Sequence, residues 1–113
     1  MRSDEYAEAL RVLGEETRLK ILRLLMERPL YVCEISAALG LSNPTVSVHL
    51  SKLRKFGFVV DRKEGKKVLY SLGRPGGELL PLFSSVLSFV RERFHVEVER
   101  LKGVKLSEVC PYE

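Results

Sequence analysis

The sequence contains few of the residues from which catalytic or metal centres are usually built. It has two cysteines, two histidines and no tryptophan. The two cysteines form no CxxC motif, no glycine-rich phosphate loop is present, and no Ser-His-Asp set can be placed. We therefore predict that the protein is not an enzyme.

Long apolar runs are also missing. No stretch approaches the roughly 18 apolar residues of a membrane-spanning helix. The first ten residues, MRSDEYAEAL, include acids and lack the apolar centre of a signal peptide. With 113 residues and 45% hydrophobic content, the chain is expected to form one domain over residues 1–113, located in the cytoplasm and without a membrane partner.

Acidic residues are absent from residues 42–59, SNPTVSVHLSKLRKFGFV, although the chain has 15 of them. Directly overlapping this segment, residues 52–74 hold eight bases and two acids, a net charge of +8 − 2 = +6, and the remainder carries 11 − 13 = −2. Charge separated in this way indicates a surface that binds a polyanion. A solvated charged face is the alternative.

Helical periodicity marks most of the first half of the chain. Apolar residues recur every three or four positions in segments 1–13, 15–28, 32–39 and 43–56. Asn43 followed by Pro44 is a strong helix-start signal, with Ser42 as the alternative cap. Segment 32–56 is therefore predicted to form two helices joined by a tight turn around Gly40.

The second half predicts a hairpin and one long helix. Two runs rich in β-branched and aromatic residues flank a turn at Gly65, so residues 57–72 are expected to form a β-hairpin with a basic tip. After the break at RPGG, a single helix is expected over 78–102. It has two apolar strips, which we interpret as a core face and a dimer contact, or else as complete burial within one chain. The tail, 103–113, has no assignment.

Helix, turn, helix and basic hairpin occur in the order of a winged helix-turn-helix, so the fold class is mainly α with a small β-hairpin wing. A helix fits the DNA major groove and its first turns reach base edges, while cations bind phosphates. DNA binding explains why residues 42–59 contain no acidic residue, because a carboxylate on this surface would face a phosphate. A winged-helix protein-interaction module is the alternative from another class.

Three stretches resemble the ArsR/SmtB repressors of metal and metalloid resistance. They are LGEETRLKILRLL (13–25), VCEISAALGLSNPTVSVHLSKLRKFGFV (32–59) and RKEGKKVLYSL (62–72). The resemblance implies a homodimer built on the first and last helices, 1–13 and 78–102. It also implies binding to palindromic double-stranded operator DNA and repression that an inducer relieves.

The DNA-contacting residues are assigned on the helix of 43–56 and on the wing. Base or groove contacts are expected from Asn43, Thr45, Ser47 and Val48. Phosphate contacts are expected from Ser51, Lys52 and Lys55 on the helix, and from Arg62, Lys66 and Lys67 on the wing. His49 is interpreted as a packing histidine rather than a metal ligand.

The sequence leaves three hypotheses for the sensory site. Arsenic-sensing relatives carry a Cys-Val-Cys-Asp-Leu pattern, and here Cys33 matches the second cysteine while Tyr31 replaces the first. As(III), Sb(III), zinc or cadmium bound by Cys33 and Cys110 is one hypothesis, although such ions need further ligands. A redox switch joining the two thiols is a second, and a metal-independent regulator with structural cysteines is a third. His95 and Glu99 are interpreted as a solvated helical contact.

Overall fold

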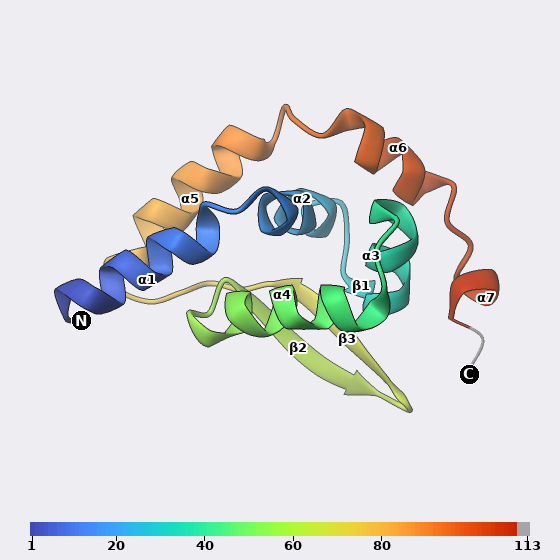
Figure 1. Cartoon of the computed structure of the whole chain (residues 1–113), viewed down its shortest axis with the longest axis horizontal. Helices are drawn as coiled ribbons and strands as arrows, with labels where there is room; N and C mark the ends of the chain where they lie inside the picture. The colour runs from blue at the N-terminus through green and yellow to red at the C-terminus, as the bar shows by residue number, and fades with distance from the viewer. Residues whose placement is uncertain (111–113) are drawn as a thin grey trace.

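The computed structural model describes residues 1–110 (Figure 1). Within them the chain forms helices flanking a small antiparallel sheet. The elements are α1 (Ser3–Leu13), α2 (Glu16–Leu25), β1 (Leu30–Tyr31), α3 (Val32–Leu39), α4 (Asn43–Lys55), β2 (Val59–Glu64), β3 (Lys67–Leu72), α5 (Leu79–Val90), α6 (His95–Lys102) and α7 (Leu106–Val109). This order confirms the expected fold class, mainly helical with a hairpin wing.

Local sequence signals set the ends of α3 and α4. Gly40 adopts a left-handed conformation with φ of 68° directly after α3, a backbone shape that glycine tolerates best. Ser42, the alternative cap, is the actual N-cap of α4, and its hydroxyl accepts a hydrogen bond from the Thr45 amide at 3.3 Å. The tight turn between α3 and α4 therefore follows from two nearby residues, Gly40 and Ser42.

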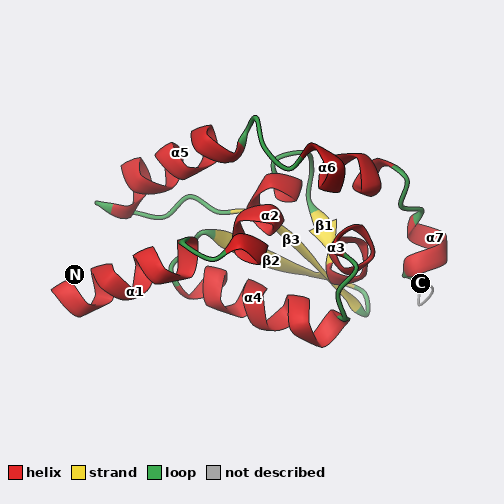
Figure 2. Ribbon diagram, turned by 45° about the horizontal axis from the view of Figure 1, so that its top comes forward, coloured by secondary structure: helices red, strands yellow, loops and turns green. Residues whose placement is uncertain are grey.

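Helix α2 lies at the centre of the core and contacts α4, α5 and α6 (Figure 2). Its buried residues Ile21, Leu22, Leu24 and Leu25 face several sides of the helix, as expected for an element surrounded by others. Beneath the helices, Phe58 and Phe83 stack with ring centroids 5.0 Å apart, which joins the start of the wing to α5.

The sheet has the strand order β1-β3-β2, with both pairings antiparallel. Strands β2 and β3 form the expected hairpin, and Gly65 in its turn has φ of 63°. Strand β1 is a two-residue addition that was not predicted. Gly73 closes the hairpin against the end of α4, where a Cβ atom would lie 2.1 Å from the Gly57 carbonyl oxygen. Only glycine fits this approach.

The prediction of one long helix over 78–102 is wrong. The chain breaks after α5 at residues 91–94, where Phe94 has a left-handed φ of 62°, and continues as α6 (Figure 1). The break has a packing reason, because α5 contacts α2 whereas α6 turns to contact α3 as well. Buried Val98 and Leu101 then add to the core over α3. None of the helices within residues 1–110 is long and apolar enough to cross a membrane.

Candidate functional site

Helix α4 turns one face to the core and presents the other to solvent. Val46, Leu50 and Leu53 are completely buried and anchor the helix. The opposite side is exposed, and Val48 shows 55% of its surface there. Of the residues predicted to contact DNA from this helix, Ser47 is half-buried and the rest are exposed, namely Asn43, Thr45, Val48, Ser51, Lys52 and Lys55.

The hairpin presents two of its three predicted cations. Arg62 and Lys66 are exposed, and Arg62 forms an ion pair with Glu64 at 2.9 Å. Lys67, in contrast, is only 8% exposed, and its ammonium lies 4.8 Å from the centre of the Tyr31 ring. Lys67 is thus not part of the exposed wing surface formed by Arg62 and Lys66, because its side chain covers the neighbouring strand β1.

The charge on this surface is arranged unevenly. Lys55 binds Glu8 of α1 at 2.6 Å, and Arg54 binds Asp61 of β2 at 2.8 Å. Lys52 and Lys66 form no ion pair within residues 1–110. Since α4 contains no acidic residue, Lys52 meets no opposing charge on its own helix.

His49 connects α4 to α1 and α2 through Arg18. The Arg18 guanidinium is buried, donates from Nε to the Val12 carbonyl at 2.6 Å, and donates from Nη1 to Nδ1 of His49 at 3.0 Å. Burial is the main cause that lowers the pKa of His49, with Arg18 and Lys52 adding to the effect and Glu15 opposing it. His49 is therefore a packing histidine, in agreement with the sequence interpretation.

Arg18 is a residue of this surface that was not predicted from the sequence. Its signal was present, because Ile21, Leu22 and Leu25 follow it at the spacing of one buried helix stripe. A charged residue on such a stripe needs buried hydrogen-bond partners, and Val12 and His49 supply them.

The two cysteines meet on the other side of the molecule. Cys33 in the first turn of α3 and Cys110 directly after α7 form a disulfide, with Cα atoms 5.7 Å apart and a sequence separation of 77. Cys110 is only 3% exposed. Residues 103–110 of the tail therefore fold back onto their own chain, an arrangement that the sequence left open.

The surroundings of the two cysteines also bear on metal binding. No group of three or more His, Cys, Asp or Glu side chains suited to a metal ion occurs within residues 1–110. When reduced, Cys33 and Cys110 offer two adjacent thiolates, which suit soft ions. His95 and Glu99 are both exposed, and Glu99 contacts Lys102 at 3.2 Å.

An exposed second helix of a helix-turn-helix, followed by a hairpin, defines a winged helix-turn-helix protein. Residues 15–60 match the family model described as bacterial regulatory protein, arsR family. The chain is also 38% identical over 91 residues to the HTH-type transcriptional regulator CmtR of Mycobacterium tuberculosis, covering 76% of this chain and 77% of that protein. The protein belongs to the ArsR family.

Two further relatives extend the comparison. The arsenical resistance operon repressor of Escherichia coli is 48% identical over 63 residues, which is 55% of this chain, and the match spans only 54% of that repressor's length. A solution structure from Mycobacterium bovis, titled a homodimeric winged helix-turn-helix DNA-binding domain and a possible ArsR-family transcriptional regulator, superposes with a TM-score of 0.64. It is 30% identical and covers 81% of this chain and 83% of that one.

Proposed function

We propose that the protein is a sequence-specific DNA-binding transcriptional regulator that acts as a dimeric repressor. The observation that carries this proposal is the exposed, acid-free face of α4 beside a wing with exposed cations. Such a face meets both needs of duplex recognition, small polar groups for base edges and cations for phosphates. Since a regulator acts where the chromosome lies, we expect it in the cytoplasm.

The proposed roles follow the position of each side chain along α4. The first turns, which would enter the major groove, supply Asn43, Thr45, Ser47 and Val48 for base contacts. Phosphate contacts would come from Ser51, Lys52, Lys55, Arg62 and Lys66. Lys67 is left out because it is buried. Lys55 must first exchange its Glu8 partner for a phosphate.

The proposed dimer uses α1 and α5. Each helix presents a large apolar side chain to solvent, Leu10 at 53% and Phe89 at 55% exposure. Exposed apolar groups on adjacent helices favour association with a second copy, and the M. bovis neighbour is titled homodimeric. Two copies related by a two-fold axis would read a palindromic operator. Helix α6, the other part of the predicted last helix, packs on α3 but leaves Val96 60% exposed, so its part in the dimer stays a prediction.

The proposed inducer acts at Cys33 and Cys110. Relatives named for mercury and arsenical resistance support a soft metal or metalloid as one class, and the reduced pair would contribute two thiolates. As(III), Sb(III), zinc or cadmium would require a further ligand from outside this pair.

The disulfide favours a second candidate, a dithiol–disulfide switch. In this reaction a hydroperoxide accepts two electrons from the two thiols and its O–O bond breaks. The S–S bond forms, and the two thiol protons pass to the peroxide oxygens, which leave as an alcohol and water. The reaction would fix α7 to α3, the first helix of the helix-turn-helix. Reduction by a small thiol would release it.

Fluorescence anisotropy of the reduced protein on its own upstream duplex tests the DNA-binding proposal. Lys52→Ala or Lys66→Ala should weaken binding to all duplexes alike and reduce the slope of log affinity against log salt by about one. Ser47→Ala should change sequence preference instead. Lys105→Ala, a substitution of an exposed cation near α7, is the matched control. If no variant differs from this control, the proposed face does not bind DNA.

A protein-docking module predicts a different result in the same assay. Its association with duplex would be weak, and it would not show the steep salt dependence that phosphate contacts produce.

A further inference from the structure

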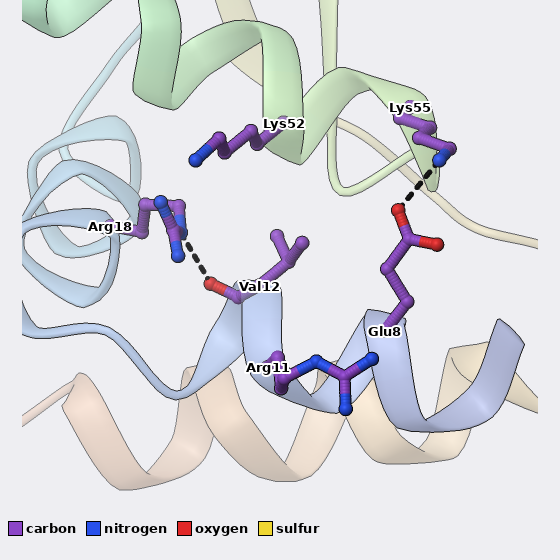
Figure 3. A pocket seen from close by; sticks show the side chains of 6 residues that line it. All are labelled: Glu8, Arg11, Val12, Arg18, Lys52 and Lys55. Carbon is purple, nitrogen blue, oxygen red and sulfur yellow. Dashed lines mark hydrogen bonds and ion pairs between the residues drawn. The ribbon is translucent and has the colours of Figure 1, made fainter. Parts of the chain in front are cut away.

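A cleft between α1 and α4 is lined by four cationic side chains and one carboxylate. It has a volume of about 210 Å³. Its lining residues are Glu8, Arg11, Val12, Arg18, Lys52 and Lys55 (Figure 3). Their formal charge is +4 − 1 = +3. The cleft has both the room and the charge for a small anion.

The Arg18 side chain is held in a fixed position in the wall of this cleft. It is only 8% exposed, and its orientation is fixed by the hydrogen bonds to the Val12 carbonyl and to His49. Within residues 1–110, the hydrogen bonds of this guanidinium use Nε and Nη1 and not Nη2. A guanidinium held in one orientation is a pre-organised donor for an oxyanion.

The other cations leave a place for such an anion. Lys52 extends from α4 toward Arg18 across the cleft (Figure 3), and neither Lys52 nor Arg11 forms an ion pair within residues 1–110. Like charges that face each other repel, so an anion between them would be attracted by both. On the far side, Lys55 binds the Glu8 carboxylate at 2.6 Å, so the one acid of the lining is already paired and does not oppose Arg18 and Lys52.

We propose that this cleft is a phosphate-binding site, with Arg18 and Lys52 as its main ligands and Arg11 at its rim. Two sources of phosphate fit this site. One is a backbone phosphate of bound DNA, and this source rests on the proposed function. The other is free phosphate. The DNA source would add residues of α1 and α2 to an interface that otherwise consists of α4 and the wing.

His49 is a built-in reporter of the site. It accepts a hydrogen bond from Arg18, and both Arg18 and Lys52 help to lower its pKa. A phosphate bound between these cations would offset their charge and raise the pKa of His49. This shift in the imidazole signal can be followed without any DNA.

The test is an NMR titration of the reduced full-length protein with sodium phosphate, against sodium chloride at matched ionic strength. We expect saturable shifts at His49 and an upward change of its pKa. Lys52→Gln should weaken the phosphate affinity about threefold or more, whereas the exposed control Lys105→Gln should leave it unchanged. No saturable response beyond that of chloride, or an equal response in both variants, would overturn the proposal.

A second experiment distinguishes a phosphate of bound DNA from free phosphate as the ligand. If the phosphate belongs to DNA, free phosphate should compete with duplex binding more than chloride does, and Arg11→Gln should weaken both. If the ligand is free phosphate, it should bind together with duplex, and Arg11→Gln should affect phosphate alone. Saturable phosphate binding by a protein that does not bind duplex would contradict the proposed regulatory function. It would not contradict phosphate binding in the cleft.

Discussion

The Cys33–Cys110 disulfide should contribute strongly to stability. It closes a loop between residues separated by 77 positions. The chain-entropy relation for such a loop gives a contribution of about 4.5 kcal/mol, and native disulfides typically contribute about 2–4 kcal/mol. With a urea m value of roughly 1.5 kcal/mol/M, reduction should lower the unfolding midpoint by roughly 1–3 M.

The assay is equilibrium urea unfolding of the oxidised and the reduced protein at one protein concentration, because dimerisation makes stability depend on concentration. Cys110→Ser is the control. It removes the bond in both conditions, so reduction should not change its midpoint. The reasoning fails if oxidised and reduced wild-type protein unfold at the same midpoint, or if thiol titration finds two free thiols after oxidation.

Three further predictions concern the core, pH and the start of α4. Phe58→Ala should lower the free energy of unfolding by about 3–5 kcal/mol, because the ring is completely buried against Phe83; a loss below 1 kcal/mol in denaturant unfolding would contradict this packing. The folded-state pKa of His49 is below the ordinary 6.5. The stability that the neutral imidazole contributes is therefore complete above about pH 6.5 and is lost as pH falls toward the folded-state pKa. His49→Gln should reduce the loss of stability between about pH 7 and 5.5, and an unchanged pH profile would show that Arg18 does not hold a neutral imidazole. Ser42→Ala should cost about 1 kcal/mol of stability and weaken duplex binding, since it removes the N-cap of α4; unchanged thermal unfolding would exclude that cap.

The helix-turn-helix could be predicted because its signals are local. Gly40, Ser42 and Pro44 mark the boundaries of α3 and α4 within a few residues of the atoms they control. The apolar stripe of α4 and the glycine of the hairpin turn are equally short-range. These features place the exposed face of α4 beside the wing, so most of the candidate DNA surface followed from sequence.

The C-terminal half could not be predicted in the same way. Hydrophobic spacing continues from Val90 to Val98 and Leu101, and periodicity does not distinguish one packing surface from two. The break at Phe94 uses a left-handed conformation without glycine, so it carries no composition signal. The position of Cys110 depends on where α6 and α7 pack, which is a long-range property. The burial of Lys67 against Tyr31 of β1 is long-range in the same sense, because it depends on which strand pairs with β3.

The most direct test of the account is the affinity of wild-type protein for its own upstream duplex, measured by anisotropy over a range of salt concentrations before and after oxidation with peroxide. We predict tight binding to that duplex by the reduced protein, with a steep salt slope, and a changed affinity after oxidation that Cys110→Ser does not show. Binding no tighter than to an unrelated duplex would contradict the proposed regulatory function. Specific binding that is the same in both redox states would instead remove the disulfide switch, and titration of the reduced protein with arsenite, antimonite, zinc and cadmium would then decide whether Cys33 and Cys110 sense a soft ion.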